Sequence, residues 1–383
     1  MHGKCCVLEE PQEMLEIKLL MQGKKQITNN FILSLVKKCT ETKDVAAGKQ
    51  IRSLVMSSRC CLGTFVYDYL IRMFAVLGHL SEANSTFRNV LTPSIYTWNA
   101  IISAFKKLGE PEKAMDLYVK MHMDGVIPDV VTYLCMLNAC GGLKRMDESR
   151  VLHHEVVNNR MDVHINVGST LVHVYAENGQ LKDARGVFDM LHSRNVVTWG
   201  AMISGYVRNG EAHVGLKLFQ IMQGEGLSPS NFTFSCVLKA CGITGAIHEG
   251  KLLHCEIMRQ NLEDDVVIGS TLIGMYLDCG SMEDAKRVFD RLENHDIISW
   301  GVMMSGYAAN GYAHHAFDLF KQLQYSTLKP NIMIYLPMLQ ASGSMQSARM
   351  GRLIHHEVTE RGLESLLNVK NTLIDMYAKC GCL

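Results

Sequence analysis

Residues 95–129 read IYTWNAIISAFKKLGEPEKAMDLYVKMHMDGVIPD, and this stretch decides the fold. Apolar side chains recur in both halves at the spacing of one helical face: Ile95, Trp98, Ile101, Ile102 and Phe105, then Ala114, Leu117, Tyr118 and Met121. Between the halves, Gly109 suits the left-handed conformation that ends a helix. Gly125 and Pro128 end the second stripe. The stretch therefore predicts two amphipathic helices joined by a short turn.

The same pattern recurs along the chain with a period of 101 residues. That interval separates matching tryptophans, glycines, prolines and histidines: Trp98, Trp199 and Trp300; Gly109, Gly210 and Gly311; Pro128, Pro229 and Pro330; His153, His254 and His355. The period divides into segments of 35, 35 and 31 residues. We expect ten complete repeats, at 29–63, 64–94, 95–129, 130–164, 165–195, 196–230, 231–265, 266–296, 297–331 and 332–366. An atypical segment or cap, 1–28, precedes them, and an incomplete repeat, 367–383, follows.

A single pair of such helices cannot bury its apolar faces alone. Neighbouring pairs must therefore stack into one continuous core, as in other helical-repeat proteins. Hydrophobic residues make up 48% of the 383-residue chain, which is sufficient for a folded core. The sequence predicts an all-α solenoid of helix–turn–helix repeats.

Composition limits the functions that the chain could have. No window approaches 18 uninterrupted apolar residues, so no membrane span is expected. The formal net charge is +0, so binding to a polyanion would require a local basic stripe rather than bulk charge. Of the thirteen cysteines, several recur with the repeat period, which favours small apolar core residues over disulfides or metal ligands: Cys39, Cys140 and Cys241; Cys135 and Cys236; Cys279 and Cys380.

The repeats resemble a known family. Residues 196–206, VVTWGAMISGY, look like the start of a pentatricopeptide repeat. Residues 232–242, FTFSCVLKACG, resemble the long variant of this repeat, and residues 272–276, LIGMY, with 284–290, DAKRVFD, resemble its short variant. Alternating ordinary, long and short repeats are typical of the land-plant subclass associated with organellar RNA editing. Tetratricopeptide repeats are the nearest competitor, but they have 34 residues and lack the terminal Pro-Asp or Pro-Asn.

The resemblance implies a right-handed superhelix that binds single-stranded RNA, with one base facing each repeat. The fifth and last residues of a repeat would select that base. An ionised Asp at the last position can only accept hydrogen bonds, which suits the ring N–H of uracil or guanine, whereas Asn can donate to adenine or cytosine. At the fifth position, Ser leaves room for a purine and the longer Asn favours a pyrimidine.

Three repeats match this pattern. Carried over by position, the resemblance assigns uracil to Asn99 with Asp129, adenine to Ser169 with Asn195, and guanine to Ser270 with Asp296. Two further ordinary repeats carry a glycine that offers no side-chain donor, Gly200 with Ser230 and Gly301 with Asn331, so weak base preference is expected there. The short repeat with Asp68 and Ser94 is unusual, and the long repeats are not decoded. The predicted target across residues 95–296 is U-n-A-n-n-G, read 5′ to 3′.

Other positions in the repeats would hold the RNA without reading it. The resemblance places Tyr96, Val197 and Ile298, each the second residue of its repeat, between neighbouring bases. The thirteenth residue is often basic, and Lys107 and Arg208 could contact phosphates there. For all of these residues, the alternative interpretation is a solvated face of the first helix.

Catalytic and metal-binding motifs are not apparent in this sequence. Related editing proteins often carry a cytidine deaminase with a His-x-Glu and a Cys-x-x-Cys zinc site. Three His-x-Glu triplets occur at one phase of the repeat, but the chain has no Cys-x-x-Cys to complete a zinc site: His153 and Glu155, His254 and Glu256, His355 and Glu357. We therefore expect no catalytic residues, no metal and no cofactor.

The leading hypothesis is sequence-specific binding of organellar single-stranded RNA, in a mitochondrion or chloroplast by resemblance. The chain would select sites for C-to-U editing, with a deaminase supplied by another chain, and neither DNA nor a membrane is an expected partner. A helical-repeat scaffold that binds proteins is the alternative, and the neutral net charge leaves it open. No transit peptide is visible near the N-terminus. Because the chain ends at Leu383 after one helix of a short repeat, we expect a fragment of a longer protein or a partner at that end.

Overall fold

Paired α-helices account for nearly all of the chain that the structure describes. The computed structural model describes residues 28–57 and 64–382, and in these ranges there are twenty-one helices and no strand. The expected cap, apart from residue 28, and the end of the first expected repeat, 58–63, lie outside the described residues. The predicted all-α, helical-repeat solenoid is confirmed.

Two structural units divide the chain, and each is described by itself. The first unit consists of residues 1–178 and 186–193, and the second of residues 179–185 and 194–383. The first contains α2 (Asn29–Thr42), α3 (Val45–Ser57), α4 (Phe65–Val76), α5 (Leu80–Arg88), α6 (Ile95–Lys107), α7 (Pro111–Met123), α8 (Val130–Leu143), α9 (Met146–Asn158) and α10 (Ile165–Glu177). Helix α11 (Leu181–Met190) has residues in both units.

The second unit repeats the same arrangement of helices. It contains α12 (Val196–Arg208), α13 (Ala212–Gly224), α14 (Asn231–Thr244), α15 (Ile247–Arg259), α16 (Val266–Asp278), α17 (Met282–Arg291), α18 (Ile297–Ala309), α19 (Ala313–Gln324), α20 (Ile332–Ser344), α21 (Ala348–Glu360) and α22 (Leu367–Lys379). None of the helices in the described part of the chain has the length and apolar character needed to cross a bilayer.

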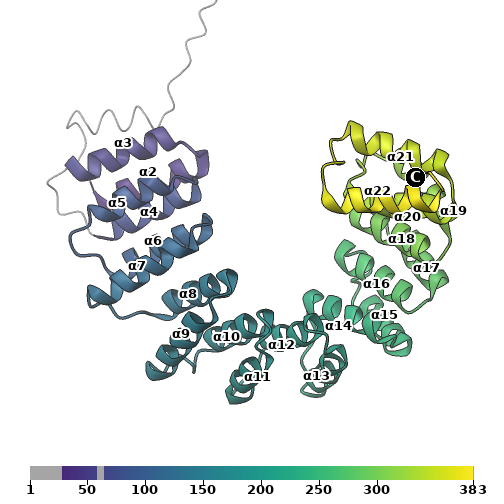
Figure 1. The fold of residues 1–383 in the computed structure, drawn as a ribbon. Helices are drawn as coiled ribbons and strands as arrows, with labels where there is room; N and C mark the ends of the chain where they lie inside the picture. Colours follow the sequence, from purple (N-terminus) through teal and green to yellow (C-terminus); the bar gives the residue numbers. More distant parts are fainter. Residues whose placement is uncertain (1–27, 58–63, 383) are drawn as a thin grey trace, which may run out of the picture. The chain divides into compact units, whose positions relative to one another are not determined.

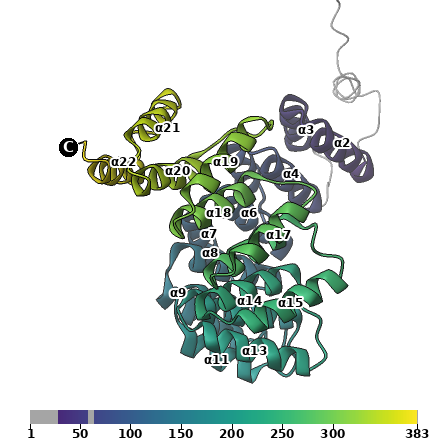
Figure 2. The same cartoon turned by 90° about the vertical axis from the view of Figure 1, so that its right-hand side faces the viewer.

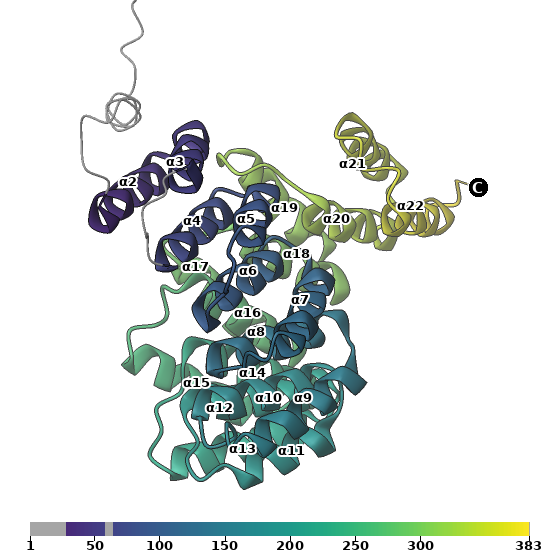
Figure 3. The ribbon, with the colours of Figure 1, turned by 90° about the vertical axis from the view of Figure 1, so that its left-hand side faces the viewer.

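Within each unit, the first helix of a pair packs on the first helices of the pairs before and after it. In the first unit these first helices are α2, α4, α6, α8 and α10, and Figure 3 shows α4, α6, α8 and α10 in succession. In the second unit they are α12, α14, α16, α18, α20 and α22, and several of them follow one another in Figure 2. The second helices lie on the other side of each unit (Figure 1). Each unit therefore has a surface built from first helices only, which we call the first-helix face.

Local sequence explains where the helices begin and end. Asp129 caps α8, because its side chain accepts a hydrogen bond from the Thr132 backbone N–H at 2.9 Å. Gly109, Gly210 and Gly311 have φ of 83°, 86° and 82°, a left-handed conformation in which a larger side chain would be strained. These glycines follow the first helix of an ordinary pair, as the sequence predicts for Gly109. Each one ends a first helix and directs the chain into the second.

The core of each unit is formed by the apolar stripes predicted from the sequence. Trp98 on α6 is fully buried, and its ring meets Phe87 of α5 edge to face with centroids 4.7 Å apart. Trp300 on α18 makes the equivalent contact with Phe289 of α17 at 5.0 Å. The tryptophan therefore joins the first helix of an ordinary pair to the second helix of the pair before it. The cysteines Cys39, Cys140 and Cys241 are also buried, as expected for small core residues.

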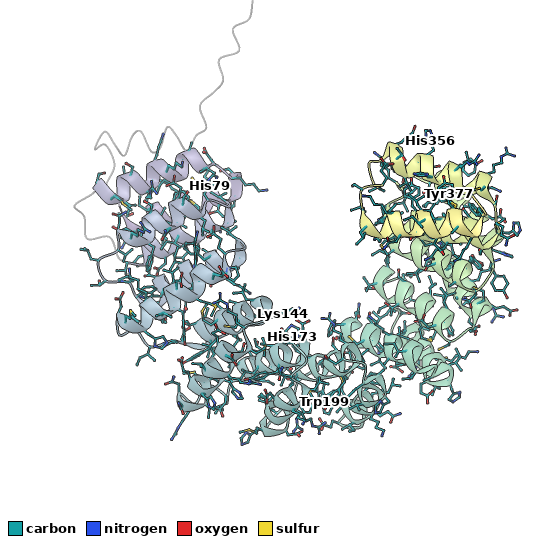
Figure 4. The ribbon with its side chains drawn as sticks, in the orientation of Figure 1. His79, Lys144, His173, Trp199, His356 and Tyr377 are labelled. Atoms are coloured by element: carbon teal, nitrogen blue, oxygen red, sulfur yellow. The ribbon has the colours of Figure 1, made fainter. Side chains whose placement is uncertain are left out.

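A second recurrent contact joins each long pair to the pair that follows. The Nδ1 atoms of three histidines lie within hydrogen-bond distance of tyrosine hydroxyls: His153 and Tyr175 (3.2 Å), His254 and Tyr276 (2.8 Å), His355 and Tyr377 (2.9 Å). Tyr377 lies between α21 and α22 in Figure 4. An imidazole that is neutral at Nδ1 accepts this bond from the hydroxyl, so protonation of that nitrogen removes the acceptor.

The Trp98 contact should dominate the stability of its part of the first unit. Trp98→Ala leaves a large cavity in a fully buried site, and we expect the free energy of unfolding to fall by about 3–5 kcal/mol. Urea denaturation followed by circular dichroism measures this decrease. Tyr96→Ala, on the same helix but 63% exposed, is the control and should change it by no more than about 0.5 kcal/mol. Equal decreases in the two variants would contradict the assignment of Trp98 to the core.

The His254–Tyr276 contact should make stability depend on pH. Burial, with the nearby Arg291 charge, lowers the pKa of His254 below 6.5, although Glu263 and Asp284 oppose the shift. The unfolded chain, with an ordinary imidazole, takes up its proton first as the pH falls. The stabilisation is therefore complete above about pH 6.5 and is lost as pH falls through the lowered folded pKa.

Unfolding free energies measured between pH 5 and 8 for the native chain and for His254→Gln test this dependence. The free energy of unfolding of His254→Gln should fall less at acidic pH than that of the native chain. His356→Gln removes an exposed imidazole on α21 (Figure 4) and is the matched control. Parallel curves for the native chain and His254→Gln would show that this histidine has no linkage to folding.

Candidate nucleic-acid interface

In three repeats with an assigned base and two repeats with a glycine at the fifth position, the last residue is the N-cap of a first helix. Its side chain accepts a hydrogen bond from a backbone N–H in the first turn: Asp129 at α8, Asn195 at α12, Ser230 at α14, Asp296 at α18 and Asn331 at α20. Asp, Asn and Ser are the residues that cap helices best. The residue types assigned to base selection therefore have a structural role as well, which the sequence-based interpretation did not recognise.

The structure brings Asn99 and Asp129 into direct contact. Asn99 lies one turn into α6, and its Nδ2 donates to both carboxylate oxygens of Asp129, at 2.9 and 3.0 Å. The Asn99 side chain is only 5% exposed in this arrangement. The two residues predicted to face one base are therefore already paired across neighbouring first helices.

Thr132 fixes the orientation of this pair. Its fully buried hydroxyl lies 2.7 Å from Asn99 Oδ1 and 3.0 Å from Asp129 Oδ1. A hydroxyl has one proton, and the shorter contact directs it to the Asn99 carbonyl oxygen. The amide nitrogen of Asn99 must then face Asp129. Sequence analysis missed Thr132, although a Thr three residues after an N-cap Asp is a recognisable capping pattern.

At Gly200 and Gly301, the next first helix packs directly against the glycine. A Cβ atom added to Gly200 would lie 3.3 Å from Thr233 Oγ1 and 3.4 Å from Phe232 Cδ1. The Ser230 and Thr233 hydroxyls, 3.0 Å apart, supply the polar atoms at this position. At Gly301, the Cβ of Met333 lies 3.4 Å from the equivalent point. The absence of a side chain thus allows α14 and α20 to approach closely.

Ser270 and Asp296 show no direct contact that would match the one between Asn99 and Asp129. Ser270 donates its hydroxyl proton to Val266 of its own helix at 2.7 Å, which leaves only its lone pairs for a base. Asp296 accepts from the Ser299 backbone N–H at 2.7 Å. Ser169 and Asn195 belong to different units, and Asn195 caps α12 through Thr198.

An exposed apolar row runs along the first-helix face of each unit. The predicted second-position residues Tyr96, Val197 and Ile298 are 63%, 67% and 45% exposed. Five other repeats contribute residues at the same position that sequence analysis did not assign: Phe65, Val131, Phe232, Val267 and Met333. The signal was present in the sequence, because each of these residues is the second of its expected repeat. Exposed apolar side chains in a row are suited to contact with unstacked bases.

Cations lie on the same face. Lys107 is exposed and lines a cavity of about 390 Å³ formed by α4, α6 and α8, which Asn99 also lines. Arg72 lines this cavity too, and sequence analysis missed it. Arg208 is exposed at the end of α12, which is the position that Lys107 occupies at the end of α6. Lys144 is exposed in the left-handed C-cap position of α8 and is labelled in Figure 4.

The His-x-Glu triplets take part in helix packing. Beside the histidine contacts described above, Glu155 accepts a hydrogen bond from the Tyr118 hydroxyl at 2.5 Å, and Glu357 accepts one from Tyr335 at 3.0 Å. In the ranges 28–57 and 64–382, no group of three His, Cys, Asp or Glu residues is placed to hold a metal ion. These contacts give the three histidines and two of the glutamates, Glu155 and Glu357, a structural role.

Comparison with known proteins identifies the family. A model of the PPR repeat family matches residues 93–142 and 194–242, and a model of the PPR repeat matches residues 131–161, 169–196, 270–297 and 298–326. Two chloroplastic pentatricopeptide repeat-containing proteins of Arabidopsis thaliana are 30% and 31% identical over 100% and 98% of this chain, and a mitochondrial one is 29% identical over 97%. The chain spans 44%, 60% and 36% of these three relatives.

The fold comparison agrees. The crystal structure of the pentatricopeptide repeat protein PPR10 in complex with an 18-nt psaJ RNA element matches 97% of this chain with a TM-score of 0.72 and 17% identity, over 59% of the PPR10 chain. At this identity the similarity concerns the fold. Together with the sequence matches, it shows that this chain belongs to the pentatricopeptide repeat family.

Proposed function

We propose that this chain binds single-stranded RNA sequence-specifically, through the first-helix face of its repeats. The observation that carries the proposal is the Asn99–Asp129 pair, held in one orientation by Thr132 beside an open cavity. Exposed apolar residues and Lys107 lie on the same face and would supply stacking and phosphate contacts. A groove with these three elements suits unstacked nucleotides.

The Asn99–Asp129 pair would favour uracil. The Asp129 carboxylate can only accept hydrogen bonds, and the N3–H of uracil is a donor. The carboxylate already accepts from Asn99, which holds it in place and leaves lone pairs available. The length of Asn99 leaves less room than Ser would, which disfavours a purine. With the other assigned pairs, the proposed target remains U-n-A-n-n-G.

The biological setting follows from the relatives. Curated relatives carry chloroplastic or mitochondrial names, so we place the RNA target in an organelle. The alternation of ordinary, long and short repeats supports a role in selecting sites for C-to-U editing, with the deaminase supplied by a separate chain.

Selection from a random single-stranded RNA library tests the proposal. The purified chain should enrich a sequence with uracil at one position and adenine and guanine at the predicted intervals. Failure to enrich any RNA, together with retention of a protein partner, would instead support a protein-binding scaffold. Enrichment of a different sequence would retain RNA binding and reject the assigned base pairs.

Asn99→Ser should change the base selected at this position from uracil to guanine. The shorter hydroxyl makes room for a purine, while Asp129 still accepts from a ring N–H. We expect the ratio of affinities for RNAs with guanine and uracil at this position to rise by about tenfold, since one well-placed base contact contributes on the order of 1–3 kcal/mol. Fluorescence anisotropy with the two RNAs measures the ratio.

Asn138→Ser is the matched control. Asn138 lies on the neighbouring first helix, and its side-chain amide donates to the Leu134 backbone carbonyl of the same helix at 2.6 Å. Its substitution should leave the base preference unchanged. An unchanged preference for uracil in Asn99→Ser would show that Asn99 does not read the base.

A further inference from the structure

A cavity between two second helices of the second unit is separate from the first-helix face. It has a volume of about 270 Å³ and lies between α13 and α15, with one residue of α14 in its wall. The buried part of its lining is apolar and consists of Phe219, Val237 and Leu253. Two acidic residues, Glu249 and Glu256, also line it. The cavity therefore combines an apolar interior with two carboxylates.

The first unit shows which group occupies the equivalent place one period earlier. Tyr118 and Glu155 precede Phe219 and Glu256 by 101 residues each. The Tyr118 hydroxyl donates a hydrogen bond to the Glu155 carboxylate at 2.5 Å. Burial, together with Glu155, raises the pKa of Tyr118, so this hydroxyl keeps the proton that it donates. A phenol is thus the group that the chain itself places against this glutamate.

The next long repeat also gives its glutamate a phenol. Tyr335 of α20 donates to Glu357 at 3.0 Å, and Gln324 of α19 donates to the same carboxylate at 3.3 Å. The residue one period before Tyr335 is Phe234 of α14. At the junction of α13, α14 and α15, phenylalanine therefore occupies both positions that carry a phenol elsewhere, Phe219 and Phe234. Neither ring has a hydroxyl to donate.

Glu256 consequently has partners from its own helix only. It accepts a hydrogen bond from Gln260 Nε2 at 2.8 Å and forms an ion pair with Arg259, and both partners lie at the end of α15. Within residues 194–382, no side chain of α13 or α14 donates to this carboxylate. A carboxylate beside an apolar cavity, with no donor from the facing helices, can accept a hydrogen bond from a ligand.

The size of the cavity and the character of its rim indicate a side chain of another protein. Small-molecule pockets usually have volumes of about 300–1,000 Å³, so a cavity of about 270 Å³ suits a single ring. The rim extends further than one ring, because Leu252 is 60% exposed and Gln220 and Gln223 are exposed beside it. A free phenol would leave Leu252 in water, whereas a peptide segment that carries a tyrosine would cover it.

The charge of the rim indicates which residues would flank this tyrosine. Glu249 is exposed in the first turn of α15 and forms no ion pair within residues 194–382. Arg259 is the only cation in the lining, and it is already paired with Glu256. The uncompensated charge of the rim is therefore negative and would attract a Lys or Arg side chain.

We propose that the cavity between α13 and α15 is a docking site for a tyrosine side chain of a protein partner, which donates its hydroxyl proton to Glu256. The ring packs on Phe219 and Leu253, and a Lys or Arg beside the tyrosine pairs with Glu249. This inference does not rest on the proposed function, because the cavity lies between second helices and RNA would occupy the first-helix face. It gives the chain a separate surface for a protein.

Selection from a library of short random peptides, with the full chain as the target, tests the docking site. The chain should enrich peptides in which tyrosine stands beside Lys or Arg. An enriched peptide should bind about tenfold more tightly than the same peptide with phenylalanine in place of tyrosine, because the lost hydrogen bond has a charged acceptor. Fluorescence anisotropy measures both affinities. This comparison uses the native chain alone, so it does not depend on the folding of a variant.

Two substitutions locate the contact. Phe219→Tyr supplies the missing hydroxyl from within the chain, as Tyr118 does one period earlier, and should weaken peptide binding by about tenfold. Glu256→Gln should weaken it by about fivefold, because a neutral amide oxygen accepts a hydrogen bond less strongly than a carboxylate. Glu357→Gln is the matched control. It removes the same charge at the same position of the next long repeat, where Tyr335 already donates, and should leave peptide affinity unchanged.

The possible outcomes separate this inference from the proposed function. If no peptide is enriched, or if the enriched peptides lack tyrosine, the docking site is wrong. Equal affinities for the tyrosine and phenylalanine peptides would show that Glu256 accepts no hydrogen bond from the ligand. Full peptide binding by Phe219→Tyr would place the contact elsewhere on the chain. Because Phe219→Tyr and Glu256→Gln should bind the selected RNA as the native chain does, failure of the RNA selection would contradict the proposed function alone.

Discussion

The hydrogen bond between a side chain and the first turn of the next helix is the interaction on which this molecule depends. It starts eight of the eleven first helices of the described residues and satisfies backbone N–H groups that have no partner in the helix. At α8 the same Asp129 carboxylate that caps the helix also accepts from Asn99. Folding and proposed recognition thus share one functional group. The last residues that cap the next helix are short and polar, whereas His164 and Leu366 hold the same position in their repeats without a side-chain cap.

The packing of the helices then determines what surrounds each cap. Within a unit, each first helix packs on the first helices before and after it, so their early residues gather on one face. Trp98 and the His–Tyr contacts lie elsewhere in the stack, between first and second helices. The core and the proposed RNA surface therefore use different sides of the same helix. This separation allows the exposed row to vary while the buried stripe stays apolar.

Periodicity was sufficient to predict the helices, the turn at Gly109 and the burial of Trp98, because these features depend on spacing within one repeat. Position in the repeat also led to Asn99 and Asp129, which the structure places in contact. Arg72 was missed because its importance comes from its place between neighbouring helices, which depends on how two repeats pack. Thr132 and Phe232 did have a signal in the sequence, the capping pattern after Asp129 and the second position of a repeat, but their contacts with the preceding first helix depend on packing. The partners of the His-x-Glu residues were missed for the same reason.

The close approach at Gly200 limits how freely repeats of this kind can be exchanged. The Gly200 backbone lies against Phe232 and Thr233 of α14. Each proposed base-binding site is therefore formed by residues of two successive repeats. A side chain installed at Gly200 would lie in contact with Phe232 and would require a small shift of Thr233. Replacing a single repeat in order to change the RNA target would therefore transfer only half of each proposed base-binding site. The exchangeable unit is a junction between repeats, running from the first helix of one repeat into the start of the next.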